Sequence, residues 1–272
     1  MQNRYTGDVG DFSKYGLMRE LNKAGLSTAL AWYLFPDETH NSDGKHIAYI
    51  GRDEFRRCDP ALHDEMYKLI STKQRNIAAV EKSKILGAHT LFHSTPLDMN
   101  QFFSFSSNKG QKSRKEARKE WLSDCVTKTK GAEIVFFDPD NGLEGNNPRP
   151  LSNKGPKFLY WSDLNSFVQR KQSLVLYNHA SRQGTIYEQI TKRLSEIKIH
   201  VPYGSNAFAM LWRKFSVRYY LVIPTDQMKD AIISTCQEMI DGPWGQSRWH
   251  RFTPVISLAA LALNWAMAVH CS

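Results

Sequence analysis

The stretch EIVFFDPDNGLE, residues 133–144, decides the fold class. It opens with a fully apolar run at 134–137, which is typical of a short strand buried on both faces of a parallel sheet. The apolar run gives way at once to Asp138, Asp140 and Asn141. Ligands of open α/β sheets bind at the carboxyl ends of the strands. We therefore expect an active site where this strand ends.

Outward from this strand, helical and strand patterns alternate along the chain. Strand-like apolar runs occupy residues 29–35, 90–93, 134–137 and 173–177. Apolar residues at helical spacing occupy residues 12–24, 60–71, 75–84, about 112–130, 161–170 and about 185–198. This alternation predicts a mostly parallel sheet with crossover helices on both faces. Two further strand-like runs, 207–212 and 218–223, flank a short basic turn and predict a C-terminal antiparallel hairpin, followed by a helix at 225–239.

The domain organisation is expected to be simple. The 272 residues suit one large α/β domain, and no internal repeat or low-complexity linker divides them. We predict a single catalytic domain over residues 1–252. Residues 253–272 contain the apolar run ISLAALALNWAMAVHCS, which lacks a polar face and is too short and interrupted to span a bilayer comfortably. We interpret it as a non-native tail, with a core helix and a membrane-leaning helix as alternatives.

The composition indicates a nucleic-acid partner and a reducing compartment. A net charge of +9 and a pI near 9.3 favour polyanions, and 12% aromatic residues supply rings for base stacking. The alternative is a merely basic protein. The four scattered cysteines form no Cys-x-x-Cys pair, and the first residues lack the apolar core of a signal peptide. We expect a cytoplasmic, DNA-binding protein with no membrane association and no obligatory protein partner.

Polar side chains follow three of the predicted strands. They are His40, Asn41, Asp43, Lys45 and His46 after the first, Asp138, Asp140, Asn141 and Glu144 after the third, and Asn178, His179, Ser181 and Arg182 after the fourth. Each group alone has a structural explanation in caps and turns. Because the carboxyl ends of parallel strands meet at one edge, their coincidence favours a functional site.

The paired acids Asp138 and Asp140 allow two kinds of chemistry. Close carboxylates can raise one pKa and create a general base, or they can hold a divalent metal ion. Glu144, Asp43 and His179 are available as further metal ligands. A metal-dependent nuclease is therefore one of the alternatives.

Cationic residues gather in two segments. In GDVGDFSKYG, residues 7–16, Asp8, Asp11 and Lys14 precede or open a helix, which indicates an anion site with Lys14 as a phosphate contact, or a cap with Asp11 at the N-cap. The segment NKGQKSRKEARKEW, residues 108–121, is either a solvated helix face or a contact to a nucleic-acid backbone. Our predicted DNA-backbone residues are Arg4, Lys14, Lys112, Arg114, Lys115, Arg118 and Arg182.

With these motifs identified, RYTGDVGDFSKY (residues 4–15) resembles the start of ribosomal RNA adenine-N6 methyltransferases, and FFDPDNGLE lies where that family carries its Asp-Pro-Pro-Tyr loop. The resemblance implies a Rossmann-like fold. Two features depart from it. Asp140 and Asn141 replace the second proline and the aromatic residue, and the loop YLFPDETHNSDGKH offers only Gly44 where a Gly-x-Gly turn would hold the cofactor.

The loops FFDPDNG and YNHASR are also similar to those of uracil-excising DNA glycosylases, and the chain looks like phage-defence glycosylases that excise glucosylated hydroxymethylcytosine. By that resemblance Asp138 or Asp140 would stabilise the sugar cation and orient water, and His179 would stabilise the departing base. Asn141 or Asn178 would read the base. The residues expected to bind base or sugar are Asp8, His40, Asn41, Asp43, Lys45, His46, Phe137, Tyr177 and Asn178.

These observations favour a DNA glycosylase that excises a flipped, modified base in antiviral defence, with catalytic residues Asp138, Asp140, Asn141 and His179 and without cofactor or metal. Three alternatives stay open. They are an adenine-N6 methyltransferase that uses S-adenosylmethionine, a metal-dependent nuclease, and a non-catalytic nucleic-acid-binding module.

Overall fold

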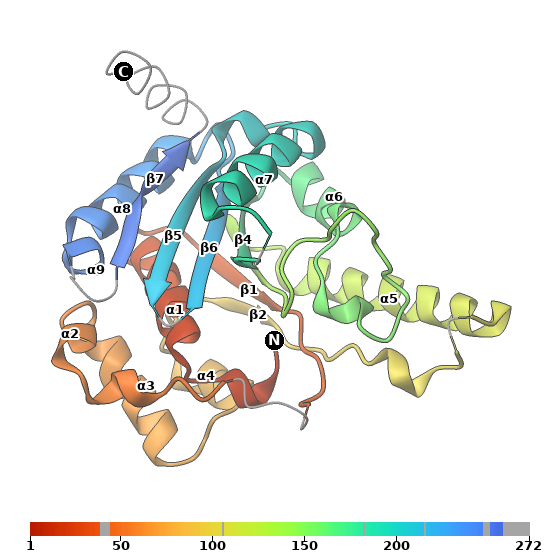
Figure 1. Ribbon diagram of the computed structural model, residues 1–272, viewed down its shortest axis with the longest axis horizontal. Coiled ribbons are helices and arrows are strands. Elements are labelled where there is room, and N and C mark those ends of the chain that lie inside the picture. Colours follow the sequence, from red (N-terminus) through yellow and green to blue (C-terminus); the bar gives the residue numbers. More distant parts are fainter. Residues whose placement is uncertain (39–43, 105, 182, 215, 247–250, 258–272) are drawn as a thin grey trace.

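The computed structural model describes residues 1–272 except 39–43, 105, 182, 215, 247–250 and 258–272. His40, Asn41, Asp43 and Arg182 lie outside the described residues. The chain forms a seven-stranded sheet with the order β2-β1-β3-β4-β6-β5-β7 (Figure 1). The strands are β1 Thr28–Trp32, β2 Leu91–His93, β3 Ile134–Asp138, β4 Ser173–His179, β5 Phe208–Lys214, β6 Ser216–Ile223 and β7 Arg251–Ser257.

The sheet is mixed, with parallel and antiparallel halves. Strands β2, β1, β3 and β4 are parallel, whereas β6 pairs antiparallel with both β4 and β5. The predicted α/β fold with a C-terminal antiparallel hairpin is therefore confirmed. Its architecture is Rossmann-like, with the parallel strands in the N-terminal part of the chain.

Helices cover both faces of the sheet (Figure 1). They are α1 Val9–Lys23, α2 Asp53–Arg56, α3 Pro60–Ser71, α4 Ile77–Ser83, α5 Asn108–Lys128, α6 Trp161–Gln169, α7 Ile186–His200, α8 Lys229–Asp241 and α9 Pro243–Gln246. Side chains of α1, α3, α4, α8 and α9 share one core, and those of α5, α6 and α7 share the other. Strand β3 serves both, because Ile134 and Phe136 point into the first core and Val135 and Phe137 into the second.

Helix α1 begins earlier than the predicted residue 12 because Asp8 caps it. The Asp8 Oδ1 atom accepts hydrogen bonds from the backbone N–H groups of Gly10 and Asp11 at 2.7 and 3.1 Å. This arrangement satisfies two backbone donors that have no partner inside the helix. The prediction of Asp11 as N-cap is wrong, and Asp11 lies in the first turn instead.

The predicted domain boundary at residue 252 is also wrong, because it cuts through β7. Phe252 pairs with Trp212 of β5 and Thr253 with Leu211, so the sheet continues to Ser257. Phe252 is buried against the Trp212 ring, with ring centroids 5.0 Å apart. The strand covers an edge of β5 that would otherwise expose unpaired backbone groups. Within the described residues, the structure contains no helix with the length and apolar character needed to span a bilayer.

The strand order creates a crevice between β1 and β3. The connection from β1 to its neighbour β2 runs through α2, α3 and α4 on one face, whereas α6 connects β3 to its neighbour β4 on the other face. The chain therefore leaves the carboxyl ends of β1 and β3 in opposite directions. Such a switch point is where open α/β sheets bind ligands.

Candidate functional site

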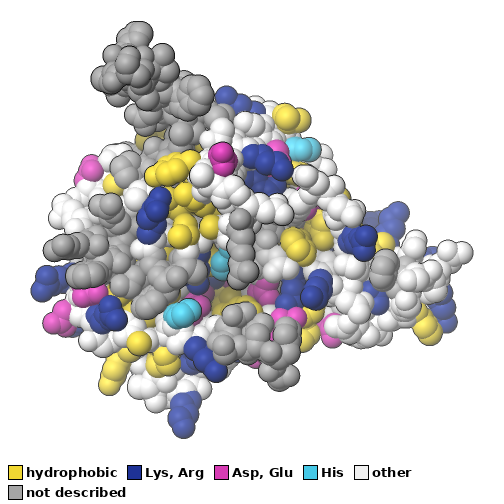
Figure 2. Space-filling view, viewed as in Figure 1, with side chains coloured by type: hydrophobic (Ala, Val, Ile, Leu, Met, Phe, Trp, Pro, Cys, Tyr) yellow, Lys and Arg dark blue, Asp and Glu magenta, His cyan; other side chains and the backbone are white. Residues whose placement is uncertain are grey.

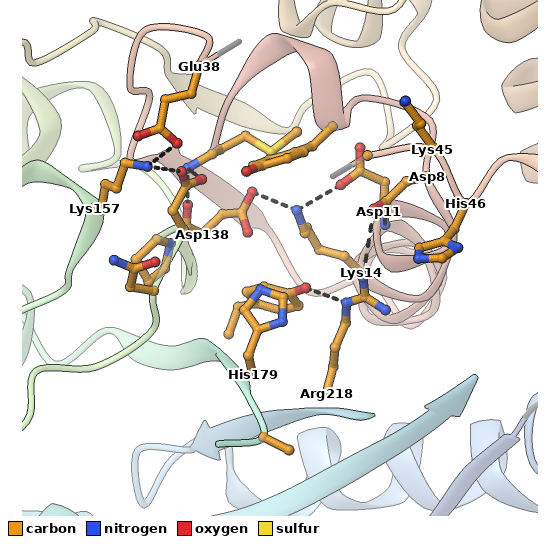
Figure 3. A pocket seen from close by; sticks show the side chains of 18 of the residues that line it. Asp8, Asp11, Lys14, Glu38, Lys45, His46, Asp138, Lys157, His179 and Arg218 are labelled. Carbon is orange, nitrogen blue, oxygen red and sulfur yellow. Dashed lines mark hydrogen bonds and ion pairs between the residues drawn. The ribbon is translucent and has the colours of Figure 1, made fainter. Parts of the chain in front are cut away.

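A cavity of about 770 Å³ opens at this switch point (Figure 3). The cavity is lined by the N-terminal residues, the start of α1, the loop after β1, the carboxyl ends of β3 and β4, the segment 154–157 and the start of β6. Its charged side chains are Asp8, Asp11, Lys14, Glu38, Lys45, Asp138, Asp140, Lys154, Lys157 and Arg218. Equal numbers of acids and bases make the cavity strongly polar without a large net charge.

A buried ion-pair cluster lies at the centre of the cavity (Figure 3). The Lys14 ammonium donates to Asp138 Oδ2 at 2.6 Å and to Asp11 Oδ1 at 2.9 Å, and all three side chains are 3% exposed. Asp11 uses its second oxygen to accept from the Gly7 N–H and the Tyr15 hydroxyl. Among the described residues, no backbone or side-chain donor bonds the Oδ1 atom of Asp138.

Two carboxylates share one ammonium group in this cluster, so the positive charge does not fully compensate the two negative charges. The pKa values of both carboxylates are raised. Burial raises the pKa of Asp138, and the opposing charge of Lys14 only partly offsets it. Burial also raises the pKa of Asp11. For Lys14, burial by itself would lower the pKa, but the Asp11 and Asp138 charges reverse this and raise it. Lys14 therefore stays protonated. Because its pKa is raised, the Asp138 carboxylate is more basic than an ordinary aspartate, which suits it to accept a proton.

Asp140 lies in a different network, formed with the N-terminal segment. Its Oδ1 atom lies 2.6 Å from the Met1 amino nitrogen, and its Oδ2 atom accepts from Gln2 Nε2 at 2.7 Å. Lys157 lies 3.6 Å from Asp140 and 2.5 Å from Glu38. Although burial opposes it, these donors lower the pKa of Asp140. Asp140 is therefore an ionised, fully engaged group.

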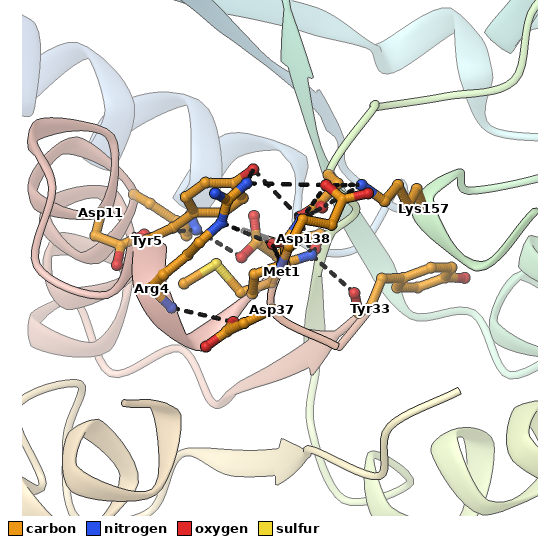
Figure 4. A network of polar contacts seen from close by, with 12 residues as sticks. Met1, Arg4, Tyr5, Asp11, Tyr33, Asp37, Asp138 and Lys157 are labelled. Carbon is orange, nitrogen blue, oxygen red and sulfur yellow. Dashed lines mark hydrogen bonds and ion pairs between the residues drawn. The ribbon is translucent and has the colours of Figure 1, made fainter. Parts of the chain in front are cut away.

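The same N-terminal segment occupies the space beyond the end of β1 (Figure 4). The Phe35 N–H donates to the Met1 carbonyl at 2.9 Å, and the Met1 amino group donates to the Tyr33 carbonyl at 2.8 Å. Met1 is 3% exposed and Gln2 is fully buried. Arg4 does not line the cavity; it donates to Gln2 Oε1 and to the Tyr5 hydroxyl instead. The prediction of Arg4 as a DNA contact is therefore not supported by its position.

His179 projects from the end of β4 at the lip of the cavity. Its ring packs edge-on against Tyr177, with centroids 4.9 Å apart. The residue is exposed, yet protein atoms crowd around its ring. These surroundings and the positive charge of Arg218 lower the pKa of His179 below its usual value. The lowered pKa leaves a neutral imidazole at pH 7.

Arg218 closes the cavity from the antiparallel half of the sheet. Its Nε atom donates to the Tyr177 hydroxyl at 2.6 Å, and its Nη2 atom lies 3.7 Å from Asp8. A Cβ atom at Gly10 would lie 2.7 Å from Arg218 Nε. Gly10 therefore permits the close approach of the guanidinium to α1.

Several exposed side chains surround the mouth of the cavity. Figure 2 shows Lys and Arg side chains around a central hollow in which acidic and histidine side chains are visible. Asn141, Lys45, His46 and Lys154 line this mouth and are exposed. No side-chain hydrogen bond joins Asn141 to another described residue, so its amide is available to a ligand. The cavity thus brings together many of the predicted catalytic and base- or sugar-binding residues. They are Asp8, Lys45, His46, Asp138, Asp140, Asn141, Tyr177 and His179.

Two predicted base-binding residues do not reach the cavity. Phe137 points into the other core, where its ring packs against Phe167 with centroids 4.9 Å apart. Asn178 is buried, and its Oδ1 atom accepts from the Leu143 N–H at 2.9 Å. It supports the turn at Gly142, whose φ of +74° suits glycine. Both assignments were wrong because adjacent strand residues face opposite sides of the sheet.

Three predicted DNA-backbone residues are buried. Lys14 is enclosed in the central cluster. On α5, Arg114 donates to the carbonyls of Phe103 and Leu151, and Arg118 forms an ion pair with Asp163 at 2.5 Å. These arginines satisfy internal acceptors, because they lie on the same helical face as the buried Trp121 and Cys125. Lys112 and Lys115 of the same helix are exposed.

The sequence patterns missed Glu38, Lys157 and Arg218. Arg218 was missed because only parallel strand ends were considered, whereas an antiparallel strand begins at the edge where its parallel neighbours end. The register of the predicted hairpin was the available signal. Glu38 and Lys157 are joined by an ion pair between two loops, for which no local pattern exists.

Among the described residues, no group of three or more His, Cys, Asp or Glu side chains has an arrangement suited to a metal ion. Glu144, an expected ligand of a nuclease, accepts from the Trp161 N–H at 2.7 Å instead. The fold and the cavity thus define a Rossmann-like α/β protein with a polar site at its switch point. No model of a known protein family matches the chain, and no curated protein matches it in sequence.

Proposed function

We propose that the protein is a DNA glycosylase that hydrolyses the N-glycosidic bond of a flipped nucleotide. One observation carries the proposal: Asp138 is a buried carboxylate with a raised pKa and an Oδ1 atom that no described residue bonds, at the base of a cavity with the neutral His179 at its lip (Figure 3). A proton acceptor and a nearby hydrogen-bond donor are what hydrolysis of this bond requires.

In the proposed reaction, the bond between the sugar C1′ atom and the base nitrogen breaks, and its electron pair leaves with the base. The Asp138 carboxylate stabilises the cationic sugar and accepts a proton from the water that adds to C1′. His179 donates a hydrogen bond to the departing base, which takes up a proton on release. The products are a free base and an abasic site.

The walls of the cavity suit a flipped nucleotide. Its volume of about 770 Å³ lies within the range of small-ligand sites, and Asn141 presents an exposed amide at the mouth. Asn side chains can pair with base edges, and flipped bases are read in this way. Asp140 is assigned as a positioning residue, since both of its oxygens are engaged with the N-terminal segment.

Two observations favour base excision over methyl transfer. The space beyond β1, where a Rossmann-like enzyme holds its cofactor, is filled by the buried residues Met1 and Gln2. In the methyltransferase loop the second proline helps to hold the target base. Asp140 stands at that position, but it bonds the N-terminal segment instead. An adenine-N6 methyltransferase is therefore the second candidate.

The test incubates the purified protein with DNA oligonucleotides that carry unmodified, hydroxymethylated or glucosylated hydroxymethylated cytosine, without metal or methyl donor. We expect free base and alkali-labile sites. The modified substrates test the role in antiviral defence, which rests on the resemblance of the sequence. Strand breakage that needs magnesium would support a nuclease, and S-adenosylmethionine binding would support the methyltransferase. DNA binding without any chemistry would support a binding module.

The matched variants are Asp138→Asn and Asp163→Asn. Both replace a buried acid whose pKa is raised by burial, but Asp163 does not line the cavity. Loss of base release only in Asp138→Asn supports the assignment. Equal base release by the two folded variants would overturn it.

A further inference from the structure

We propose that Tyr187 and Arg213 form a stacking platform beside the cavity, on which the DNA base next to the flipped nucleotide rests. The inference rests on the proposed function and adds the path of the substrate strand. It also assigns a role to a pair of exposed residues that take no part in the proposed hydrolysis.

Two sets of contacts place this pair at the lip of the cavity. Arg213 of β5 pairs with Val217 of β6, whose carbonyl accepts from the N–H of the cavity residue Ala180 at 3.1 Å. Tyr187 lies in the first turn of α7, two residues before Gln189. The Gln189 side chain bonds both backbone groups of Ser181, which also lines the cavity, at 2.8 and 3.1 Å.

The pair itself has the properties of a base-stacking surface. Tyr187 is 48% exposed, an unusual position for a large ring. The Arg213 guanidinium lies 6.0 Å from the centre of this ring and donates to its hydroxyl at 3.4 Å. An aromatic ring orientated by a guanidinium offers a rigid apolar face beside a positive charge, and single strands bind to such faces.

The charges at the lip favour a DNA strand over an acidic or apolar protein segment as the occupant. Lys45, Lys154 and Arg213 are exposed, and within the part of the chain that the structure describes none of them forms an ion pair. Lys45 and Lys154 line the cavity from separate loops, so unpaired cations flank its mouth together with one exposed ring. Alternating phosphates and bases match this combination.

The stacking platform would lower the free-energy cost of base flipping. When a nucleotide leaves the stack, the neighbouring base loses a stacking partner, and a side chain that replaces this partner lowers the cost of flipping. Tyr187 lies outside the cavity, where such a neighbouring base would lie.

The experiment measures binding of a short fluorescent single-stranded oligonucleotide to the full-length protein and to Tyr187→Ala, Tyr187→Phe and Tyr67→Ala. Tyr67 is 56% exposed on α3 and does not line the cavity, which makes it a matched control. We expect Tyr187→Ala to weaken binding about tenfold, whereas Tyr187→Phe and Tyr67→Ala retain the affinity within about twofold. The dependence on salt should fall by about 0.7 in slope for Arg213→Ala.

Equal affinities of Tyr187→Ala and Tyr67→Ala would overturn the platform. If the wild-type protein releases base while Tyr187→Ala binds and turns over DNA normally, the inference fails and the proposed function stands. If no base is released but Tyr187→Ala loses affinity, the proposed function fails and the stacking platform stands. A fluorescent 2-aminopurine next to the target base adds a direct readout, since its quenching should depend on Tyr187.

Discussion

The central cluster of Lys14, Asp11 and Asp138 has a counterpart on the opposite face of the sheet, formed by Arg118 and Asp163. In both clusters a basic side chain of a helix meets a buried acid, and burial raises the pKa of that acid. Asp163 accepts three hydrogen bonds, from Arg118 at 2.5 Å and from the Tyr33 hydroxyl and Tyr160 N–H at 3.2 Å each. Asp138 accepts only one side-chain bond, from Lys14.

This difference shows that burial and a raised pKa do not by themselves mark a functional group, because structural ion pairs share both properties. All three bonds to Asp163 end on its Oδ2 atom, so within the described residues both acids have an Oδ1 atom that accepts no hydrogen bond. What distinguishes Asp138 is its single side-chain donor and its position at the cavity wall. Asp163 instead joins α5, α6 and the segment that follows β1 through the donors that surround it. We therefore expect substitution of Asp138 to affect mainly catalysis and substitution of Asp163 to affect mainly stability.

The largest expected effect is on catalysis at Asp138. Asp138→Asn should lower the rate of base release about 10³-fold, because the amide cannot accept the proton of the attacking water. The fold should persist, since Lys14 keeps Asp11 as its charge partner at 2.9 Å. Single-turnover kinetics together with circular dichroism would check both statements. A folded Asp138→Asn variant with wild-type kinetics would remove the distinction between the clusters.

Next in size is the effect on stability at Asp163. Asp163→Asn should cost about 3–5 kcal/mol of unfolding free energy, because it leaves the buried Arg118 without its counter-charge. Base release by the fraction that is folded should stay near the wild-type rate. Urea denaturation measures the first quantity and an activity assay at low temperature the second. Greater stability loss in Asp138→Asn than in Asp163→Asn would contradict the comparison.

The pH dependence should separate activity from folding. Asp138 must be ionised to accept a proton, and burial raises its pKa above the ordinary 3.8, so base release should fall about tenfold per pH unit below that raised value. The pKa of Asp140 is lowered, so its stabilising contacts persist until the pH falls through a lower value. A pH–rate profile and near-ultraviolet circular dichroism in the same buffers should therefore show activity lost first. Simultaneous loss would argue that acid acts on the fold alone.

The smallest effects are expected on the exposed face of α5. Lys112→Ala and Lys115→Ala should each reduce the salt dependence of duplex DNA binding by about 0.9 in slope if these lysines contact phosphates. Lys198→Ala, an exposed lysine on α7, is the control and should leave the slope unchanged. Unchanged slopes in all three variants would make α5 a solvated helix face.

Much of the fold was predictable because local patterns report burial directly. The apolar run before Asp138, and helix α3 over the predicted residues 60–71, follow from spacing that is set within each element. The convergence of polar strand ends was also predictable, since parallel strands end at one edge. Arg114 and Arg118 could have been placed correctly too, because they lie one helical turn apart on the stripe that continues to Trp121.

By itself the sequence determined the α/β class, the order of the first six strands along the chain and the strand end that carries Asp138 and Asp140. Only the tertiary structure decided which of these acids is open to a ligand, because that depends on donors distant in the chain. Lys14 lies 124 residues from Asp138, and Gln2 lies 138 residues from Asp140. Such partners meet only when the sheet assembles, and their number decides whether a buried carboxylate is a structural anchor or a reactive group.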